Sequence, residues 1–301
     1  MAPLMPALVV VIGALWILSL PSLLSPRRRA IRVTTMALVY VIGETVTIIC
    51  CFGLWLVRAG PGPHARLLKA FLGALIGLAK PVFGFRLHVG EEDRFGTGPA
   101  IVLARHAGPG ASFALVHLLM ARYDRRPHVV LKEQLRWDPA IDLLLTRIGC
   151  TWIARDTEAS VVGEAARDLE DREALVLFPE GADWTPLRHI AAVARLRRKG
   201  LLKEARAALR MPHVLPPRPA GTVAALQANP SADVLVFTHA GHDELLDAGK
   251  AWAALPLSEP LEMAWWRADD VPSRHSSADD IEGWLTDTWE RIDSWVSARE
   301  D

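Results

Sequence analysis

The sequence is poor in the residues that build disulfide frameworks and metal clusters. Its 301 residues include three cysteines, Cys50, Cys51 and Cys150, whose spacing fits neither a disulfide framework nor a set of metal ligands. Reduced thiols of this kind indicate a cytosol-facing protein. The formal net charge is zero, so total charge favours no class of partner. Internal repeats and long low-complexity tracts are also absent, which excludes a repeat architecture.

The charges that are present are unevenly distributed. Between Arg188 and Arg218 basic residues abound and Glu204 is the single acid, whereas acids dominate from Asp269 to Asp301. Such a basic stretch is either a solvated surface or a site for an anionic partner, namely a membrane surface or a phosphorylated ligand. Nucleic acid is the weaker choice, because no nucleic-acid motif accompanies the charge.

The first sixty residues are strongly apolar. One apolar run covers residues 4–24 and another covers residues 36–57, with the arginine-rich segment 27–32 between them. Each run is long enough to cross a bilayer of about 30 Å as a helix, and a buried soluble hairpin is the weaker alternative. We expect residues 1–60 to form a membrane-anchoring helical hairpin and residues 61–301 to form one further domain.

The hairpin is expected to lie shallowly in one leaflet. Arginine-rich segments stay on the cytoplasmic side, and a shallow hairpin keeps the following domain on that side as well. Glu44 interrupts the second apolar run. Because a carboxylate in hydrocarbon is costly, Glu44 either faces the partner helix or indicates that the hairpin does not span fully. The apolar segment Leu67–Ala79 favours a helix at the membrane interface.

From about residue 85 the pattern becomes that of an α/β domain. Short apolar runs predict strands at residues 100–103, 128–131, 151–153, 174–178, 234–237 and 261–266. Helices are predicted at residues 112–122, 140–148, 160–172, 190–209 and 278–298. This alternation predicts a mostly parallel central sheet flanked by helices. Ser276 or Ser277 is expected to cap the last helix.

Several side chains that suit catalysis or phosphate binding follow the predicted strands. His106 comes directly after the first strand and before Gly108-Pro109-Gly110, and an imidazole there can take a proton from a hydroxyl near neutral pH. The segment Phe178-Pro179-Glu180-Gly181 places one carboxylate at a rigid turn after the next strong strand. The carboxyl edge of an open α/β sheet is where ligands bind. The alternatives to a functional site are that His106 is merely exposed or structural and that the segment Phe178–Gly181 is an ordinary turn with an exposed glutamate.

Three basic side chains suit a phosphate at the same edge. Arg155 closes the run from Gly149 to Arg155, just after the predicted strand 151–153, and its guanidinium fork matches phosphate geometry. Arg218 lies in a stiff segment between two prolines and either adds a second contact or lies on the surface. Lys132 is the weakest of the three candidates.

In order and chemistry, four blocks resemble the glycerolipid acyltransferase family, which includes the lysophosphatidate acyltransferases. They are the His106 loop, Gly149 to Arg155, Phe178 to Gly181, and Val214 to Pro219. The resemblance implies that His106 is the general base on a lipid hydroxyl. It also implies that Arg155 binds the acceptor's phosphate, that Glu180 and Gly181 bind the glycerol phosphate, and that Pro217 shapes the acyl-donor site, beside the candidate contact Arg218. It implies no metal or organic cofactor beyond the acyl carrier, acyl-CoA or acyl carrier protein.

The chain departs from the family at one position. The family's histidine motif continues with four residues and an aspartate that orients the ring, but position 111 is Ala111. Removing the carboxylate from a comparable triad costs about 10⁴ in turnover. Ser112 or Asp183 could take its place. We therefore expect a membrane-associated enzyme that acylates a lysophospholipid, with lysophosphatidate as the first choice. A lipid-binding protein that has lost catalysis and an acyltransferase for another acceptor are the alternatives.

Overall fold

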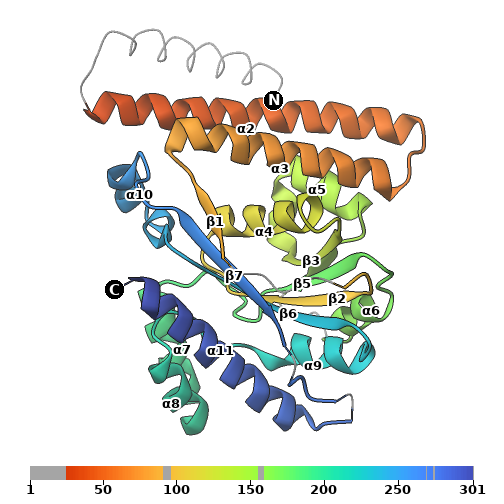
Figure 1. The fold of residues 1–301 in the computed structure, drawn as a ribbon, viewed down its shortest axis with the longest axis vertical. Helices are drawn as coiled ribbons and strands as arrows, with labels where there is room; N and C mark the ends of the chain where they lie inside the picture. Colours follow the sequence, from red (N-terminus) through yellow and green to blue (C-terminus); the bar gives the residue numbers. More distant parts are fainter. Residues whose placement is uncertain (1–24, 91–95, 155–158, 269, 274, 301) are drawn as a thin grey trace.

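The computed structural model describes residues 25–90, 96–154, 159–268, 270–273 and 275–300. A seven-stranded sheet runs through the middle of the molecule, with helices on both faces (Figure 1). The strands are β1 (Leu87–Val89), β2 (Ala100–Ala104), β3 (Arg126–Lys132), β4 (Thr151–Ile153), β5 (Glu173–Leu177), β6 (Asp233–Ala240) and β7 (Leu261–Arg267). The predicted α/β fold with a mostly parallel sheet is confirmed.

The strands lie in the order β1-β7-β6-β2-β5-β3-β4. β7 runs antiparallel to β6, and every other pair of neighbours is parallel. All six strands predicted from the sequence are present. β1 was missed, because three residues at a sheet edge, two half-buried and one exposed, leave no recognisable pattern. β2 and β5 are neighbours in the middle of the sheet, so the residues that follow them emerge side by side.

The helices surround this sheet on both faces. They are α2 (Ser25–Leu56), α3 (Pro61–Phe83), α4 (Pro109–Ala121), α5 (Pro139–Arg147), α6 (Ser160–Arg167), α7 (Pro186–Arg198), α8 (Leu202–Arg210), α9 (Pro219–Ala228), α10 (Ala248–Ala254) and α11 (Ala278–Glu300), with the 3₁₀ helices η1 (Glu133–Trp137) and η2 (Asp243–Leu246).

Two hydrophobic cores lie on the two faces of the sheet. Along β2, Val102 and Ala104 join the core beneath α3 and α4, whereas Ile101 and Leu103 join the core beneath α9 and α11. This alternation follows from the two-residue period of a strand. Because both faces are covered, every residue of β2 and β5 is buried. The central strands are thus a rigid support for the loops at their carboxyl ends.

The N-terminal apolar region is only partly described. The first predicted hairpin helix, residues 4–24, lies outside the described residues. The second run forms most of α2, which begins at Ser25 and therefore includes the arginine-rich segment. Residues 28–56 are long and apolar enough to cross a membrane. α2 packs along α3 at one end of the molecule (Figure 1).

Glu44 of α2 faces the α/β domain. It lies beside Tyr40 and Asp138, and the Tyr40 hydroxyl donates to Asp138 Oδ2 at 2.5 Å. Asp138 is also the N-cap of α5 and accepts from the Ile141 amide at 2.9 Å. The carboxylate in the apolar run thus belongs to a polar contact that joins α2 to α5.

Some predicted helices differ from the structure at their ends. α4 begins at Pro109 rather than near Ser112, because proline suits the first helical turn and Gly108 (φ 98°) supplies the N-cap. The helix predicted over residues 190–209 is two helices, α7 and α8, separated at Gly200 (φ 75°). α9 was missed. The cap of α11 is Ser277, whose hydroxyl accepts from the Asp280 amide at 3.1 Å.

Candidate active site

His106 lies just beyond the carboxyl end of β2. Its amide donates to Glu180 Oε1 at 2.9 Å, and its carbonyl accepts from the Trp184 amide at 2.7 Å. The imidazole centroid is 4.6 Å from that of Phe178, and the side chain is 25% exposed. The ring is therefore held on one side by the segment that follows β5, and it is accessible to a ligand on another.

A carboxylate lies beside the ring although position 111 is alanine. His106 Nδ1 is 3.4 Å from Asp183 Oδ1, and the same oxygen accepts from the Gly108 amide at 2.9 Å. Ser112, the other candidate for this place, donates instead to the Gly108 carbonyl at 3.3 Å, within its own helix turn. Of the two alternatives that the sequence left open, the structure places Asp183 next to the histidine.

The surroundings of His106 favour its neutral form. Burial is the main influence and lowers its pKa, the nearby Asp183 carboxylate raises it, and the positive charges of Lys132 and Arg188 lower it. The net result is a pKa below that of a free histidine side chain. A neutral imidazole can accept a proton, which is what a general base requires.

The Glu180 side chain is buried and does not project from the sheet edge. The residue is 2% exposed. Its Oε1 accepts from the His106 amide at 2.9 Å and its Oε2 from the Leu215 amide at 2.8 Å. Burial raises the pKa of this carboxyl to about 7, against the opposing influence of Arg105 and the two amides. Glu180 therefore joins the His106 loop to the Val214–Pro219 segment.

Gly181 and Arg218 are in direct contact. Gly181 has φ 66°, and a Cβ built on it would lie 3.2 Å from the Arg218 guanidinium carbon, so the arginine lies flat against the glycine. The Arg218 amide donates to the Pro179 carbonyl at 2.9 Å. In the described part of the chain no carboxylate pairs with this guanidinium. Pro217, directly before it, is partly buried. Two of the four sequence blocks thus meet beside the His106 loop.

Arg105 has a structural role that the sequence analysis missed. Its side chain is 1% exposed and donates to the His239 carbonyl (2.9 Å), the His213 carbonyl (2.9 Å) and Asp243 Oδ2 (3.0 Å). It therefore links the ends of β2 and β6 to the segment before α9. Only its position directly before His106 pointed to it in the sequence.

The expected phosphate ligand Arg155 lies outside the described residues. β4, the strand before it, is parallel to β3 at the edge of the sheet and is separated from β2 by β5 and β3. The strands β2, β5, β3 and β4 are all parallel, so the carboxyl end of β4 lies at the same edge of the sheet as His106. The role of Arg155 stays a prediction.

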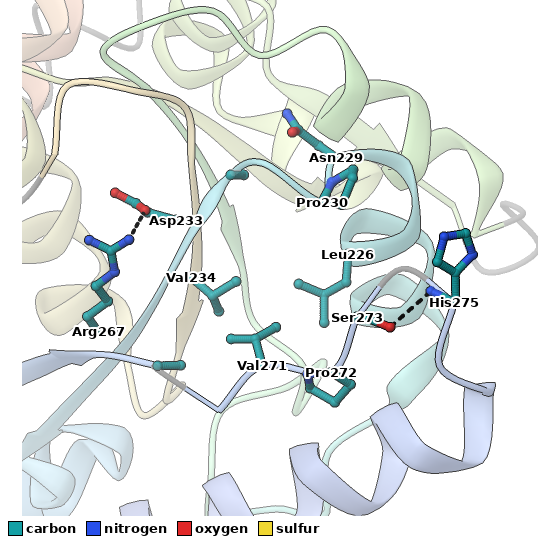
Figure 2. A pocket seen from close by; sticks show the side chains of 12 residues that line it. Leu226, Asn229, Pro230, Asp233, Val234, Arg267, Val271, Pro272, Ser273 and His275 are labelled. Atoms are coloured by element: carbon teal, nitrogen blue, oxygen red, sulfur yellow. Dashed lines mark hydrogen bonds and ion pairs between the residues drawn. The ribbon is translucent and has the colours of Figure 1, made fainter.

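A separate surface pocket of about 430 Å³ lies near the amino end of β6, away from the carboxyl edge of the sheet. Figure 2 shows Val234 and Leu226 in it, with the Asp233–Arg267 ion pair at one side. Because Val234 is at the amino end of β6, this pocket is remote from the His106 loop. No group of metal-binding His, Cys, Asp and Glu side chains is found within the described ranges.

The fold and this site define an α/β enzyme with a histidine and a carboxylate at the carboxyl edge of a parallel sheet. The family model described as Acyltransferase matches residues 86–218, which include all the candidate site residues. Residues 86–218 are therefore an acyltransferase domain, which agrees with the resemblance to the glycerolipid acyltransferases.

A solved structure shows the same fold. It is the crystal structure of the 1-acyl-sn-glycerophosphate (LPA) acyltransferase PlsC from Thermotoga maritima. It is similar to this chain with a TM-score of 0.56 and 14% sequence identity, over 88% of this chain and 97% of that chain. A search of proteins with curated descriptions gave no match.

Proposed function

We propose that this protein transfers a fatty acyl group from a thioester to the free hydroxyl of a lysophospholipid, with lysophosphatidate as the first candidate. The supporting observation is the position of His106 at the carboxyl edge of the sheet, next to a carboxylate and joined through Glu180 to the segments that carry Gly181 and Arg218. PlsC of Thermotoga maritima, a 1-acyl-sn-glycerophosphate (LPA) acyltransferase, has the same fold. Such a reaction is a step of phospholipid biosynthesis.

In this mechanism His106 Nε2 takes the proton of the acceptor hydroxyl while the hydroxyl oxygen attacks the thioester carbonyl carbon. The tetrahedral intermediate then collapses, the carbon–sulfur bond breaks, and the thiolate of the acyl carrier leaves and takes up the proton. The products are the acylated lipid and a free thiol. The donor is acyl-CoA or acyl carrier protein, and the reaction needs no metal or organic cofactor of its own.

The basic groups of the site suit the acceptor's phosphate. Arg218 presents a guanidinium without a carboxylate partner among the described residues, and Arg155 follows β4 at the same sheet edge. Arginine forks bind phosphate oxygens in pairs. We propose that these two side chains bind the headgroup, while Glu180 acts through the backbone of the His106 loop instead of touching the lipid.

The enzyme is proposed to work at a cytoplasmic membrane surface. α2 is the supporting element, because one of its sides packs on α3 and α5 and the other exposes apolar side chains. A helix with one apolar side outward suits the interfacial plane of a bilayer.

The proposed function is tested by assaying purified protein with labelled acyl-CoA or acyl carrier protein and a panel of lysolipids. We expect acyl transfer to lysophosphatidate, and we expect His106→Ala to lower it by at least about 100-fold, as for the loss of a general base. His88→Ala is the matched control, because His88 is an exposed histidine of β1. Activity that survives His106→Ala would refute the site. Lysolipid binding without turnover would favour the lipid-binding alternative to which Ala111 points.

A further inference from the structure

The carboxylate beside His106 does not come from position 111, where the family motif has its aspartate. It comes from a different part of the chain. Ala111 is buried in the first turn of α4 and has no group that could orient an imidazole. Asp183 lies 72 positions further on, in the loop between β5 and α7, and its Oδ1 is 3.4 Å from His106 Nδ1. Tertiary structure thus brings a carboxylate to the ring from a second loop.

We propose that Asp183 is the positioning residue of the His106 base and replaces the aspartate that is missing at position 111. This rests on the proposed acyl transfer. His106 Nδ1 has no hydrogen-bond partner among the described residues, and a hydrogen bond from Nδ1–H to Asp183 would leave the lone pair of Nε2 free to accept the proton of the acceptor hydroxyl. The Asp183 carboxylate stabilises the imidazolium that forms, as the carboxylate does in a serine–histidine–aspartate triad. The proton then passes from Nε2 to the leaving thiolate.

Asp183 is held in place from three directions. Its Oδ1 accepts from the Gly108 amide at 2.9 Å, at the N-terminus of α4, where a negative charge is favoured. Its Oδ2 is 3.5 Å from Arg188 Nη1. The neighbouring Trp184 amide donates to the His106 carbonyl at 2.7 Å. The carboxylate therefore has a defined position relative to the histidine without any contribution from residue 111.

The other charged and titratable groups around the ring do not offer the same contact. Both oxygens of Glu180 accept hydrogen bonds from backbone amides. His239 of β6 is buried, and burial lowers its pKa. The positive charges of Lys132 and Arg188 oppose protonation of the His106 ring. The groups that face His106 are Asp183, Glu180, Lys132, Arg188 and His239. Asp183 is the carboxylate among them that approaches an imidazole nitrogen, and its charge raises the pKa of His106.

The first test measures the pairing without any assay of activity. The pKa of His106 is followed by NMR in protein labelled with ¹³C-histidine, and His106→Gln assigns its signal. We expect Asp183→Asn to lower the pKa of His106, because the neutral amide no longer stabilises the imidazolium. The control is Asp124→Asn, which removes an exposed carboxylate paired with Arg172 at 2.7 Å. An unchanged pKa in Asp183→Asn would overturn the proposal.

The second test measures acyl transfer by the same variants. We expect Asp183→Asn to lower kcat by about 100-fold or more with little change in KM, and to move the acidic limb of the pH profile of kcat/KM to lower pH. Adding Ala111→Asp to Asp183→Asn is expected to restore activity by about tenfold or more, since the carboxylate returns from the first turn of α4. If Ala111→Asp restores no activity to Asp183→Asn, and Asp183→Asn unfolds at a lower midpoint than wild type, then Asp183 has a purely structural role and the proposal is overturned.

The outcomes separate this proposal from the proposed function. Full activity in Asp183→Asn, together with an inactive His106→Ala, would refute the role of Asp183 and leave the acyltransferase site intact. If the wild-type protein has no turnover and the Ala111→Asp variant does, Asp183 does not replace the missing aspartate. Protein without acyl transfer in any variant, with any donor and acceptor, would refute both.

Discussion

At the scale of single residues, Glu180 joins two loops through its carboxylate. Both oxygens accept hydrogen bonds from backbone amides, that of His106 at 2.9 Å and the buried amide of Leu215 at 2.8 Å. In Glu180→Gln the amide nitrogen replaces one acceptor, so one N–H loses its partner. A buried unpaired group costs about 1–3 kcal/mol. We expect that loss in the free energy of unfolding, measured in urea, and lower turnover because the His106 loop is less well held. Glu164→Gln, at an exposed site on α6, is the control.

The cost of Glu180→Gln should depend on pH. The pKa of Glu180 is raised by burial from 4.5 to about 7 in the folded protein. Between these values the folded chain keeps a proton that the unfolded chain has lost, so wild-type stability falls as pH rises through this window. The variant does not titrate there. The stability difference between wild type and variant should therefore be larger at pH 5 than at pH 8. A difference independent of pH would contradict the raised pKa.

The sequence predicted where the site residues lie better than what they contact. His106 and Glu180 follow apolar strands, and neighbouring parallel strands bring such residues to one edge. The inward direction of Glu180 and the approach of Asp183 depend on how two loops pack together. No local sequence pattern predicts that packing. No local pattern predicts the hydrogen bonds of Arg105 either.

At the scale of elements, α2 presents two different sides. Tyr40, Glu44 and Cys51 face the domain, while the opposite side exposes a continuous apolar stripe. Its members are Ile42, Val46, Ile49, Phe52 and Leu56, and each is more than half exposed. Their spacing of three or four residues puts them on one side of a helix. An exposed apolar stripe of this length marks a membrane or protein contact, and the proposed membrane association assigns it to lipid.

A charge within the stripe should weaken binding to membranes. Ile49 is 64% exposed, so Ile49→Asp leaves the packing of the domain intact. Losing the burial of one isoleucine in lipid removes about 1.5–3 kcal/mol, and we expect vesicle affinity to fall by about tenfold or more in a sedimentation assay. Leu187→Asp is the matched control, because Leu187 is 79% exposed on α7. Equal losses in both variants would argue against a membrane contact specific to α2.

Secondary structure was predictable wherever a local pattern was strong. The buried central strands were recovered because a continuous apolar run of four or five residues between turns has few other interpretations. The break between α7 and α8 was missed because a single glycine is tolerated in a helix, and only tertiary packing turns it into an end. α4 starts early for a similar reason, since Gly108 adopts a conformation that the sequence permits without requiring.

At the scale of the whole molecule, apolar and basic surfaces lie at opposite ends. Figure 1 has the longest axis vertical, with α2 at the top and α8 near the bottom. The basic stretch that was recognised in the sequence forms α7, α8 and the segment after them. Its last member, Arg218, lies against Gly181. This arrangement favours a solvated surface or a phosphorylated ligand over a membrane as the partner of the basic stretch.

The separation of the two ends predicts how charge affects membrane binding. Arg197 and Arg198 are exposed at the end of α7. If they touched an anionic bilayer, each would contribute about 1 kcal/mol, and reversing both charges would weaken binding by about 100-fold or more. Because charge effects fade beyond a screening length of about 8 Å in physiological salt, we expect R197E/R198E to bind vesicles containing anionic lipid within about twofold of wild type. A steep loss would place the basic helices at the bilayer, and α2 could then no longer be the element that sets the orientation of the domain.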